Sequence, residues 1–465
     1  MDELIYASAT ALAKAIRAKE VSAVEVMEAY LRRIEAVNPK LNAVVQLPVD
    51  MAYTEAQAAD TALARGELKG PLHGVPFTVK DNIDTAGVLC TVGTTGRASF
   101  VPTQDATIVA RMRTAGAIML GKTNLPELGL ATETDNLVYG RTNNPYDLSR
   151  TPGGSSGGEG AIIAAGGSPC GLGNDLGGSI RIPAHFCGIA GLKPTSGRLP
   201  KTGIAFGHGG AFENMWQHGP LARSVEDLHL ILSLVTGPDG RDPSVAPAPL
   251  RDSRTLELNK LRVAFYTDNG IYAPTVETAA TVKASAKILA EAGVAVEENR
   301  PKEIEHGYEI FIGLLGADGG VGLQRFLQLI GSTELSPFLQ QYLRLVHLQS
   351  LSTTDFLGLM VQWDLWRSVM LTFLDHYDAI LCPASAYPAP PHGVATRIGS
   401  FPAFSYTSTY NLAGWPGVVV RGGTSPEGLP IGVQVVAGPW REDVALAVAQ
   451  HLETALGGWQ RPPLA

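Results

Sequence analysis

The sequence predicts an α/β protein with one large, mixed and twisted sheet, helices on both faces and an added helical subregion. Helix-like and strand-like segments alternate through most of the chain, which is typical of a mainly parallel or mixed sheet. Hydrophobic residues make up 45% of the 465 residues and charged residues 17%, as in globular chains with a large core. No internal repeat or low-complexity linker divides the chain, so we expect a single domain over 1–465.

The first half of the chain carries its helix and strand signals in sequence. Ser22 and Glu25 form a capping box, and apolar residues follow at helical spacing toward Pro39. An alanine-rich helix follows Asp50, and Asp105 is expected to cap a helix through Arg113. The other expected elements are a short buried strand within 74–84 that places Lys80 at its far end, strands at 117–120 and 170–174, and helices at 156–165 and 224–236 (with Ser224 as its cap).

The second half contains a region of different character. Residues 306–376 hold three long helix-like segments rich in Leu, Phe and Trp, with no clear strand, so we expect a lid-like helical subregion packed over the sheet. Around it lie the expected strands at 261–266, 294–298, 379–383, 417–422 and 429–438 and the expected helices at 274–292 and 442–456.

Composition excludes several classes of function. A net charge of −8 argues against nucleic acid as a partner. The N-terminus has charges inside its apolar face, and no later run is apolar enough to cross a membrane, so we expect neither a signal peptide nor an integral membrane segment. The four scattered cysteines form neither a disulfide framework nor a zinc-like spacing. We therefore expect a cytoplasmic enzyme without metal or cofactor.

Two Gly/Ser clusters, GGSSGG at 153–158 and NDLGGS at 174–179, stand out because apolar residues follow both. The first cluster has three interpretations: a tight turn without chemical role, a phosphate-binding helix N-terminus, or the GxSxG nucleophile elbow of α/β-hydrolases. Glu159 would repel a phosphate. The elbow requires a preceding strand, which NPYDLSRTP is not, and a late histidine such as His392 or His451.

The second cluster suits an oxyanion hole, since consecutive small residues can direct several backbone N–H groups into one cavity with Ser179 at its edge. Ser179 would need a base, and neither cluster contains a histidine. A lysine serves if burial lowers its pKa toward neutrality, and Lys80 is the candidate. A solvated lysine in an ion pair is the alternative interpretation of Lys80 from its own segment alone.

Five segments together resemble the amidase signature family of serine hydrolases. They are VKDNID around Lys80, GKTNLPELG at 121–129, GRTNNPYDLSRTPGGSSGG at 140–158, GNDLGGSIRIPA at 173–184 and GLKPTSGRLP at 191–200. These motifs place the core of the resemblance at 74–200, and similarity extends over most of the chain. Within the family, segments at 261–270, 405–417 and 432–443 look most like the fatty acid amide hydrolases.

The resemblance implies a role for each matching residue. Lys80 would be the general base, Ser179 the nucleophile and Ser155 the bridging serine, joined to Gly154 by a cis peptide bond. Backbone N–H groups of the residues around the nucleophile would bind the oxyanion. These residues are Leu176, Gly177, Gly178 and Ser179 itself. Supporting residues behind them would be Ser156, Asp175 and Arg181, with Asp175 and Arg181 paired.

The sequence departs from the family pattern at two places. Leu176 replaces the common Thr or Ile, which is harmless if only its N–H acts. Arg421 stands where proline is common, and a charge near the pocket mouth would alter specificity. Membrane docking, as in the animal fatty acid amide hydrolases, is not implied.

The substrate is expected to be a small amide with a hydrophobic acyl or aryl group, because we find no arginine placed for a second carboxylate. Expected pocket walls, each of which could equally be ordinary core, are Leu130, Phe212, Met215, Trp216 and the helices at 309–315 and 357–366. Carbamates and esters share the reaction class. The alternative function is an amidotransferase subunit that releases ammonia from glutamine. A homodimer remains open.

Overall fold

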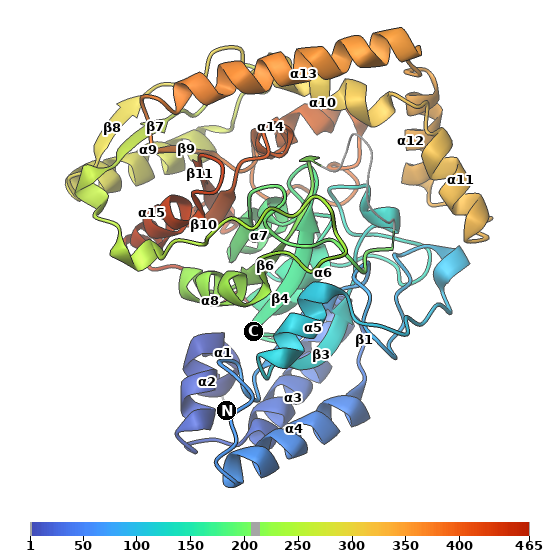
Figure 1. Cartoon of the computed structure of the whole chain (residues 1–465), viewed down its shortest axis with the longest axis vertical. Coiled ribbons are helices and arrows are strands. Elements are labelled where there is room, and N and C mark those ends of the chain that lie inside the picture. The colour runs from blue at the N-terminus through green and yellow to red at the C-terminus, as the bar shows by residue number, and fades with distance from the viewer. Residues whose placement is uncertain (1, 206–213, 465) are drawn as a thin grey trace.

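The computed structural model describes residues 2–205 and 214–464, and its eleven strands form one mixed sheet (Figure 1). The strands are β1 (Val44–Gln46), β2 (Pro76–Lys80), β3 (Ile118–Thr123), β4 (Cys170–Asp175), β5 (Ala190–Lys193), β6 (Gln217–Ala222), β7 (Arg262–Phe265), β8 (Ala295–Glu298), β9 (Ala379–Pro383), β10 (Gly417–Thr424) and β11 (Pro430–Ala437). Their order is β1-β3-β2-β4-β6-β5-β10-β11-β9-β7-β8. β3, β2 and β4 run parallel, as do β9, β7 and β8, and the pairs between β4 and β9 run antiparallel.

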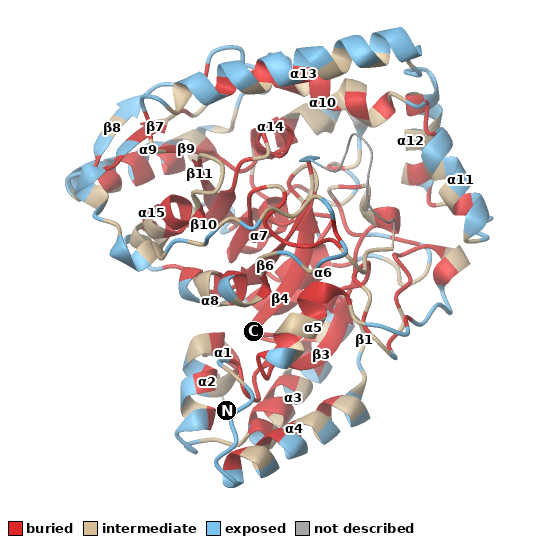
Figure 2. Ribbon diagram, viewed as in Figure 1, coloured by how far each residue is buried: buried red, intermediate tan, exposed pale blue. Residues whose placement is uncertain are grey.

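Helices surround this sheet and bury its strands, as Figure 2 shows by the buried centre and exposed outer helices. The helices are α1 (Asp2–Tyr6), α2 (Ala9–Arg17), α3 (Ala23–Leu41), α4 (Val49–Ala64), α5 (Thr107–Thr114), α6 (Gly157–Ala164), α7 (Arg181–Cys187), α8 (Val225–Val235), α9 (Val276–Glu291), α10 (His306–Gly316), α11 (Val321–Leu329), α12 (Pro337–His347), α13 (Thr353–Phe373), α14 (Ser405–Leu412) and α15 (Glu442–Leu456). The mixed sheet with its helices confirms the predicted α/β fold class.

Local capping explains where several helices begin. Ser22 accepts from the Glu25 N–H while Glu25 accepts from the Ser22 N–H, so the predicted capping box begins α3. Ser224 caps α8 as expected. The predicted cap by Asp105 is wrong: its carboxylate accepts from the Ala86 N–H and pairs with Arg113, and α5 has no side-chain cap.

Three strands have no counterpart in the sequence prediction. β1, β5 and β6 are short, and β6 contains Gly219 and Pro220, residues that are uncommon inside strands. β6 lies in the middle of the sheet, antiparallel to both β4 and β5. Tertiary pairing, rather than local propensity, therefore creates these strands.

Residues 306–376 form four helices, α10–α13, rather than the three predicted, and α13 crosses the top of the molecule in Figure 1. α13 is anchored by two buried indoles: Trp363 donates to the Leu412 carbonyl and Trp366 to the Glu303 carbonyl. In the described part of the chain, no single helix is long and apolar enough to span a membrane. α10 and α11 reach that length and apolarity only as a pair, bent by 43°.

Candidate active site

Lys80 is the last residue of β2, and its side chain lies entirely inside the protein. Its Nζ donates to Ser155 Oγ at 2.6 Å and to Asn174 Oδ1 at 2.8 Å. Burial lowers the pKa of Lys80 to about 7, against opposing effects of Asp175 and Glu159. A large share of this amine is therefore uncharged near neutral pH, and the solvated ion pair considered for it is excluded.

The two Gly/Ser clusters meet at this amine. The peptide bond between Gly154 and Ser155 is cis. The next residue, Ser156, donates its N–H to the Ser179 carbonyl at 3.0 Å and its hydroxyl to the Asn174 carbonyl at 3.3 Å. These bonds tie the loop that carries Ser155 to the loop that carries Ser179, and both serines line one cavity.

Asp175 organises the loop before Ser179. Its carboxylate accepts from the N–H groups of Gly178 at 2.8 Å and Ile180 at 3.1 Å. The same carboxylate binds the Arg181 guanidinium through Nε at 3.0 Å and Nη2 at 2.9 Å, and both side chains are fully buried. Although burial disfavours its charge, Arg181 holds the pKa of Asp175 well below its usual value. The predicted pairing of Asp175 with Arg181 is confirmed.

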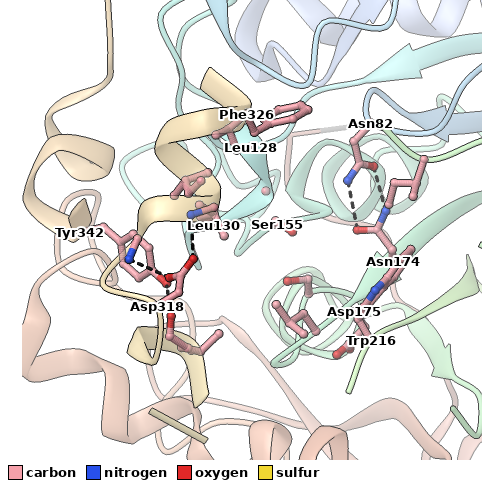
Figure 3. A pocket seen from close by; sticks show the side chains of 18 residues that line it. Asn82, Leu128, Leu130, Ser155, Asn174, Asp175, Trp216, Asp318, Phe326 and Tyr342 are labelled. Atoms are coloured by element: carbon pink, nitrogen blue, oxygen red, sulfur yellow. Dashed lines mark hydrogen bonds between the residues drawn. The ribbon is translucent and has the colours of Figure 1, made fainter. Parts of the chain in front are cut away.

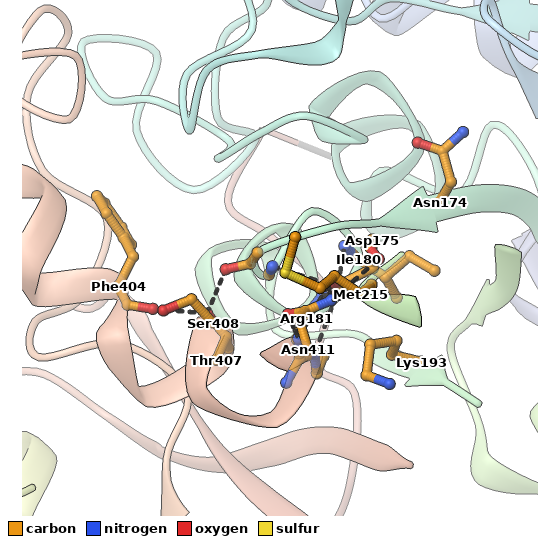
Figure 4. Close-up of polar contacts among 12 residues, drawn as sticks. Asn174, Asp175, Ile180, Arg181, Lys193, Met215, Phe404, Thr407, Ser408 and Asn411 are labelled. Atoms are coloured by element: carbon orange, nitrogen blue, oxygen red, sulfur yellow. Dashed lines mark hydrogen bonds and ion pairs between the residues drawn. The ribbon is translucent and has the colours of Figure 1, made fainter. Parts of the chain in front are cut away.

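The Asp175–Arg181 pair is fixed from the C-terminal half of the chain (Figure 4). Arg181 Nη1 donates to Gln434 Oε1 at 2.6 Å, and Nη2 also donates to Asn411 Oδ1. Asn411 Nδ2 donates to Asp175 Oδ1 at 2.9 Å and to the Met215 carbonyl at 2.9 Å. β11 and α14 thus hold the loop that ends at Ser179.

The four residues expected to form an oxyanion hole do not lie alike. Leu176, Gly177 and Ser179 line the cavity, whereas Gly178 does not. The Gly178 N–H is already bonded to Asp175, so it differs from the expected free donor. Gly178 has φ +130°, and a Cβ there would lie 2.3 Å from Thr407 Oγ1, so the turn requires glycine.

An amide pair that sequence reasoning missed lies beside Lys80. Asn174 Nδ2 donates to Asn82 Oδ1 at 2.9 Å, and Asn82 Nδ2 approaches Asn174 Oδ1 at 3.4 Å. Both side chains are buried and line the cavity (Figure 3). The pair fixes the orientation of Asn174, so Oδ1 points at the Lys80 Nζ. Both residues stand inside the motifs named above, but their pairing depends on the sheet, which joins β2 to β4.

The cavity has two lobes that share Ser179, Leu130, Leu176 and Tyr342. The first lobe, of about 350 Å³, contains Ser155, Asn82 and Asn174 in its wall. The rest of its wall comes chiefly from Leu128, Ile204, Trp216, Leu315, Asp318, Leu323 and Phe326. The second lobe, of about 230 Å³, is bounded chiefly by Gly177, Tyr308, Phe311, Ile312, Leu345, Val346, Phe401 and Phe404.

The expected wall residues divide between cavity and core. Leu130 and Trp216 line the cavity, whereas Met215 is buried in a hydrophobic cluster behind it. Phe212 lies outside the described residues. Helix 309–315 contributes to both lobes as expected, but no residue of 357–366 does; α11 and α12 take that place.

Arg421 and the histidines lie elsewhere. Arg421 donates to the Tyr146 hydroxyl at 3.1 Å and to Thr424, and it is absent from the described walls of both lobes, so a place at the pocket mouth is wrong. His392 binds Glu133 at 2.8 Å rather than Ser156. The elbow interpretation therefore gains no support from His392.

Comparisons with known proteins agree with this geometry. A family model described as Amidase matches residues 25–446. The acylamidase of Rhodococcus erythropolis is 33% identical, covering 97% of this chain and 95% of its own. Fatty-acid amide hydrolase 2 of Homo sapiens is 33% identical, covering 99% of this chain and 91% of its own. The solved structure of 6-aminohexanoate cyclic dimer hydrolase with its substrate superposes with a TM-score of 0.89 at 31% identity, over 99% of both chains.

Proposed function

Since the chain belongs to the amidase signature family and is an amide hydrolase, we propose that Ser179 is its nucleophile, Ser155 its proton relay and Lys80 its base. One observation carries this assignment: the fully buried Lys80 Nζ lies 2.6 Å from Ser155 Oγ, in a cavity that Ser179 also lines. A buried amine with a pKa of about 7 can accept a proton that an exposed lysine would not.

In the acylation step, Ser179 Oγ attacks the amide carbonyl carbon. Its proton passes to Ser155, whose own proton passes to Lys80. The tetrahedral intermediate then breaks its C–N bond, and Ser155 gives a proton to the departing nitrogen and regains one from Lys80. This delivery is essential, because an amide anion is too basic to leave unprotonated.

The negative oxygen of the intermediate needs donors fixed in advance. We assign them to the N–H groups of Leu176, Gly177 and Ser179, while the Gly178 N–H holds the loop through Asp175. Donors of this kind are each worth roughly 10²–10³ in rate. Water then attacks the acyl-enzyme by the same route, with Lys80 accepting its proton through Ser155, and the carboxylic acid leaves.

The walls of the cavity support a hydrophobic acyl or aryl amide as the substrate. Among the described residues that line either lobe there is no lysine or arginine, which a second carboxylate on the substrate would require. Leu, Ile, Phe and Trp side chains predominate instead. Carbamates and esters undergo the same acyl transfer, so a substrate panel includes them alongside amides.

The alternative function is release of ammonia from glutamine for a partner. It has a relative in a glutamyl-tRNA(Gln) amidotransferase component of Carboxydothermus hydrogenoformans, 33% identical over 97% of each chain. Glutamine carries a free carboxylate, and the absence of a cationic side chain from the described walls argues against it as the preferred substrate. Faster turnover of glutamine or acetamide than of aryl and long-chain amides, or strict dependence on a copurifying partner, would favour the alternative.

Labelling with a fluorophosphonate, followed by mass spectrometry, tests the nucleophile directly. We expect the label on Ser179, loss of nearly all turnover in Ser179→Ala, Lys80→Ala and Ser155→Ala, and a milder loss in Ser156→Ala. If Ser156→Ala were inactive while Ser179→Ala retained activity, the elbow interpretation would replace this one.

Compartment and assembly belong to the same proposal. All four cysteines are buried and unpaired, which supports a reducing compartment such as the cytoplasm. A homodimer is tested by sedimentation of the purified chain at several concentrations. Fractionation of the source cells tests the compartment.

A further inference from the structure

The two lobes of the cavity differ in which catalytic groups they contain. Ser155, which returns the proton to the departing nitrogen, lines the first lobe and not the second. Gly177, from the proposed oxyanion loop, lines only the second lobe. Because the leaving nitrogen must face Ser155, the amine portion of the substrate extends into the first lobe and the acyl portion into the second. This orientation depends on the roles assigned under the proposed function.

The second lobe suits an apolar acyl group. Its described wall contains no charged side chain, and Phe311, Phe401 and Phe404 contribute aromatic surface. The first lobe differs because it contains Asp318. The other carboxylate at its wall, Asp175, is fully buried and bound by Arg181. Asp318 therefore offers the first lobe a carboxylate that no described cation neutralises.

Asp318 is held in place. One of its carboxylate oxygens accepts from the Gly320 N–H and the other from the Gly322 N–H, both at 2.7 Å (Figure 3). Each carboxylate oxygen has two lone pairs, so both can accept a further hydrogen bond. Phe326 and Tyr342 line the same lobe, and aromatic faces attract cations. A fixed carboxylate beside aromatic rings recognises an ammonium group.

We propose that the preferred substrates are N-substituted amides of apolar acids whose amine portion carries a second, protonated amino group that binds Asp318. Hydrolysis of such a substrate gives an apolar carboxylic acid and a diamine. Asp318 acts here as a specificity-determining residue and takes no part in proton transfer.

The test uses phenylacetyl amides of two matched series. One series contains mono-acylated diamines from ethylenediamine to 1,6-diaminohexane, and the other contains n-alkylamines in which a methyl group replaces the distal ammonium. At about pH 8.5, Lys80 is uncharged while alkylammonium groups keep their protons. We expect kcat/KM to favour the cationic member by about three- to tenfold at one chain length or more, as for a charge-assisted hydrogen bond to a partly exposed carboxylate.

Two variants connect this preference to the residue. Asp318→Asn should abolish the preference while leaving kcat/KM for the neutral series within about twofold, and Asp318→Lys should invert it. Asp355→Asn is the matched control, because Asp355 is also an exposed carboxylate near a helix N-terminus, that of α13, but does not line the cavity. The control should keep the wild-type preference.

Three results would overturn the proposal: no chain length favours the cation, the preference survives Asp318→Asn, or Asp355→Asn removes it equally. Failure of the proposed function would look different. In that case neither series would be hydrolysed, or Ser179→Ala would hydrolyse both.

Discussion

Replacing Asn174 by Asp tests whether Lys80 works as an uncharged base. The two side chains have nearly the same shape, so the substitution changes mainly the charge of the atom that Lys80 contacts at 2.8 Å. In the native protein this contact is to a neutral amide oxygen. A carboxylate there would stabilise the ammonium form and raise the pKa of Lys80 above its native value of about 7.

The size of the effect follows from the separation of the charges. Two unit charges about 4 Å apart interact by about 4 kcal/mol at an effective dielectric constant of 20, and one pKa unit corresponds to about 1.4 kcal/mol. Opposite charges this close shift pKa values by about one to three units in proteins. Since only the uncharged amine accepts a proton, the acid limb of the pH profile should move up by the same amount. At pH 7 the expected loss of kcat/KM is roughly five- to 500-fold.

The assay is kcat/KM against pH for one neutral amide, with the folded state checked at each pH. Activity of Asn174→Asp should recover as the pH rises above the shifted limb. Asn174→Leu removes the acceptor without adding charge, so it should lower the plateau without an upward shift of the limb. Asn259→Asp adds the same charge at an exposed position and should change neither. An acid limb in Asn174→Asp that coincides with the native limb would refute the role of Lys80 as base.

Three further substitutions test other parts of the site. Arg181→Met leaves the Asp175 carboxylate buried without its cation, so urea unfolding should show a loss of about 3–5 kcal/mol, and a loss below about 1 kcal/mol would contradict the buried pair. Gly178→Ala forces a Cβ against Thr407 and displaces the oxyanion loop; kcat should fall by about 10²–10³, and unchanged kcat would show that the loop tolerates movement. Phe311→Trp narrows the second lobe, so kcat/KM should fall for long or aryl acyl groups and hold for acetyl amides; an equal fall for both would place the acyl group elsewhere.

Local signals were sufficient where one side chain decides the structure. The Ser22–Glu25 capping box and the Ser224 cap were predictable because the cap and its partner are three residues apart. Asp105 carried the same signal, yet its carboxylate binds the distant Ala86 N–H. A long-range partner therefore decided the position, and no local pattern contained it.

The catalytic motifs were predictable as motifs, but their contacts were not. Spacing along the chain could not show that β2 and β4 are parallel neighbours, and this pairing is what brings Asn82 to Asn174. The cavity walls depended still more on tertiary structure. Met215 and Trp216 are adjacent in sequence, but one packs in the core and the other lines the first lobe.

Low pKa alone does not identify the base, as a second lysine shows. Burial also lowers the pKa of Lys193 to about 7, but its Nζ donates to the Pro194 carbonyl, which cannot give up a proton. Lys80 differs because its partner is the Ser155 hydroxyl, which can. The nearby carboxylate of Asp175 is bound to Arg181 rather than to Lys80, and the direct acceptors of Lys80 are a hydroxyl and an amide oxygen. Neutral acceptors around Lys80 and a paired anion beneath the loop are thus two parts of one requirement, since a carboxylate free to contact Lys80 would hold it protonated.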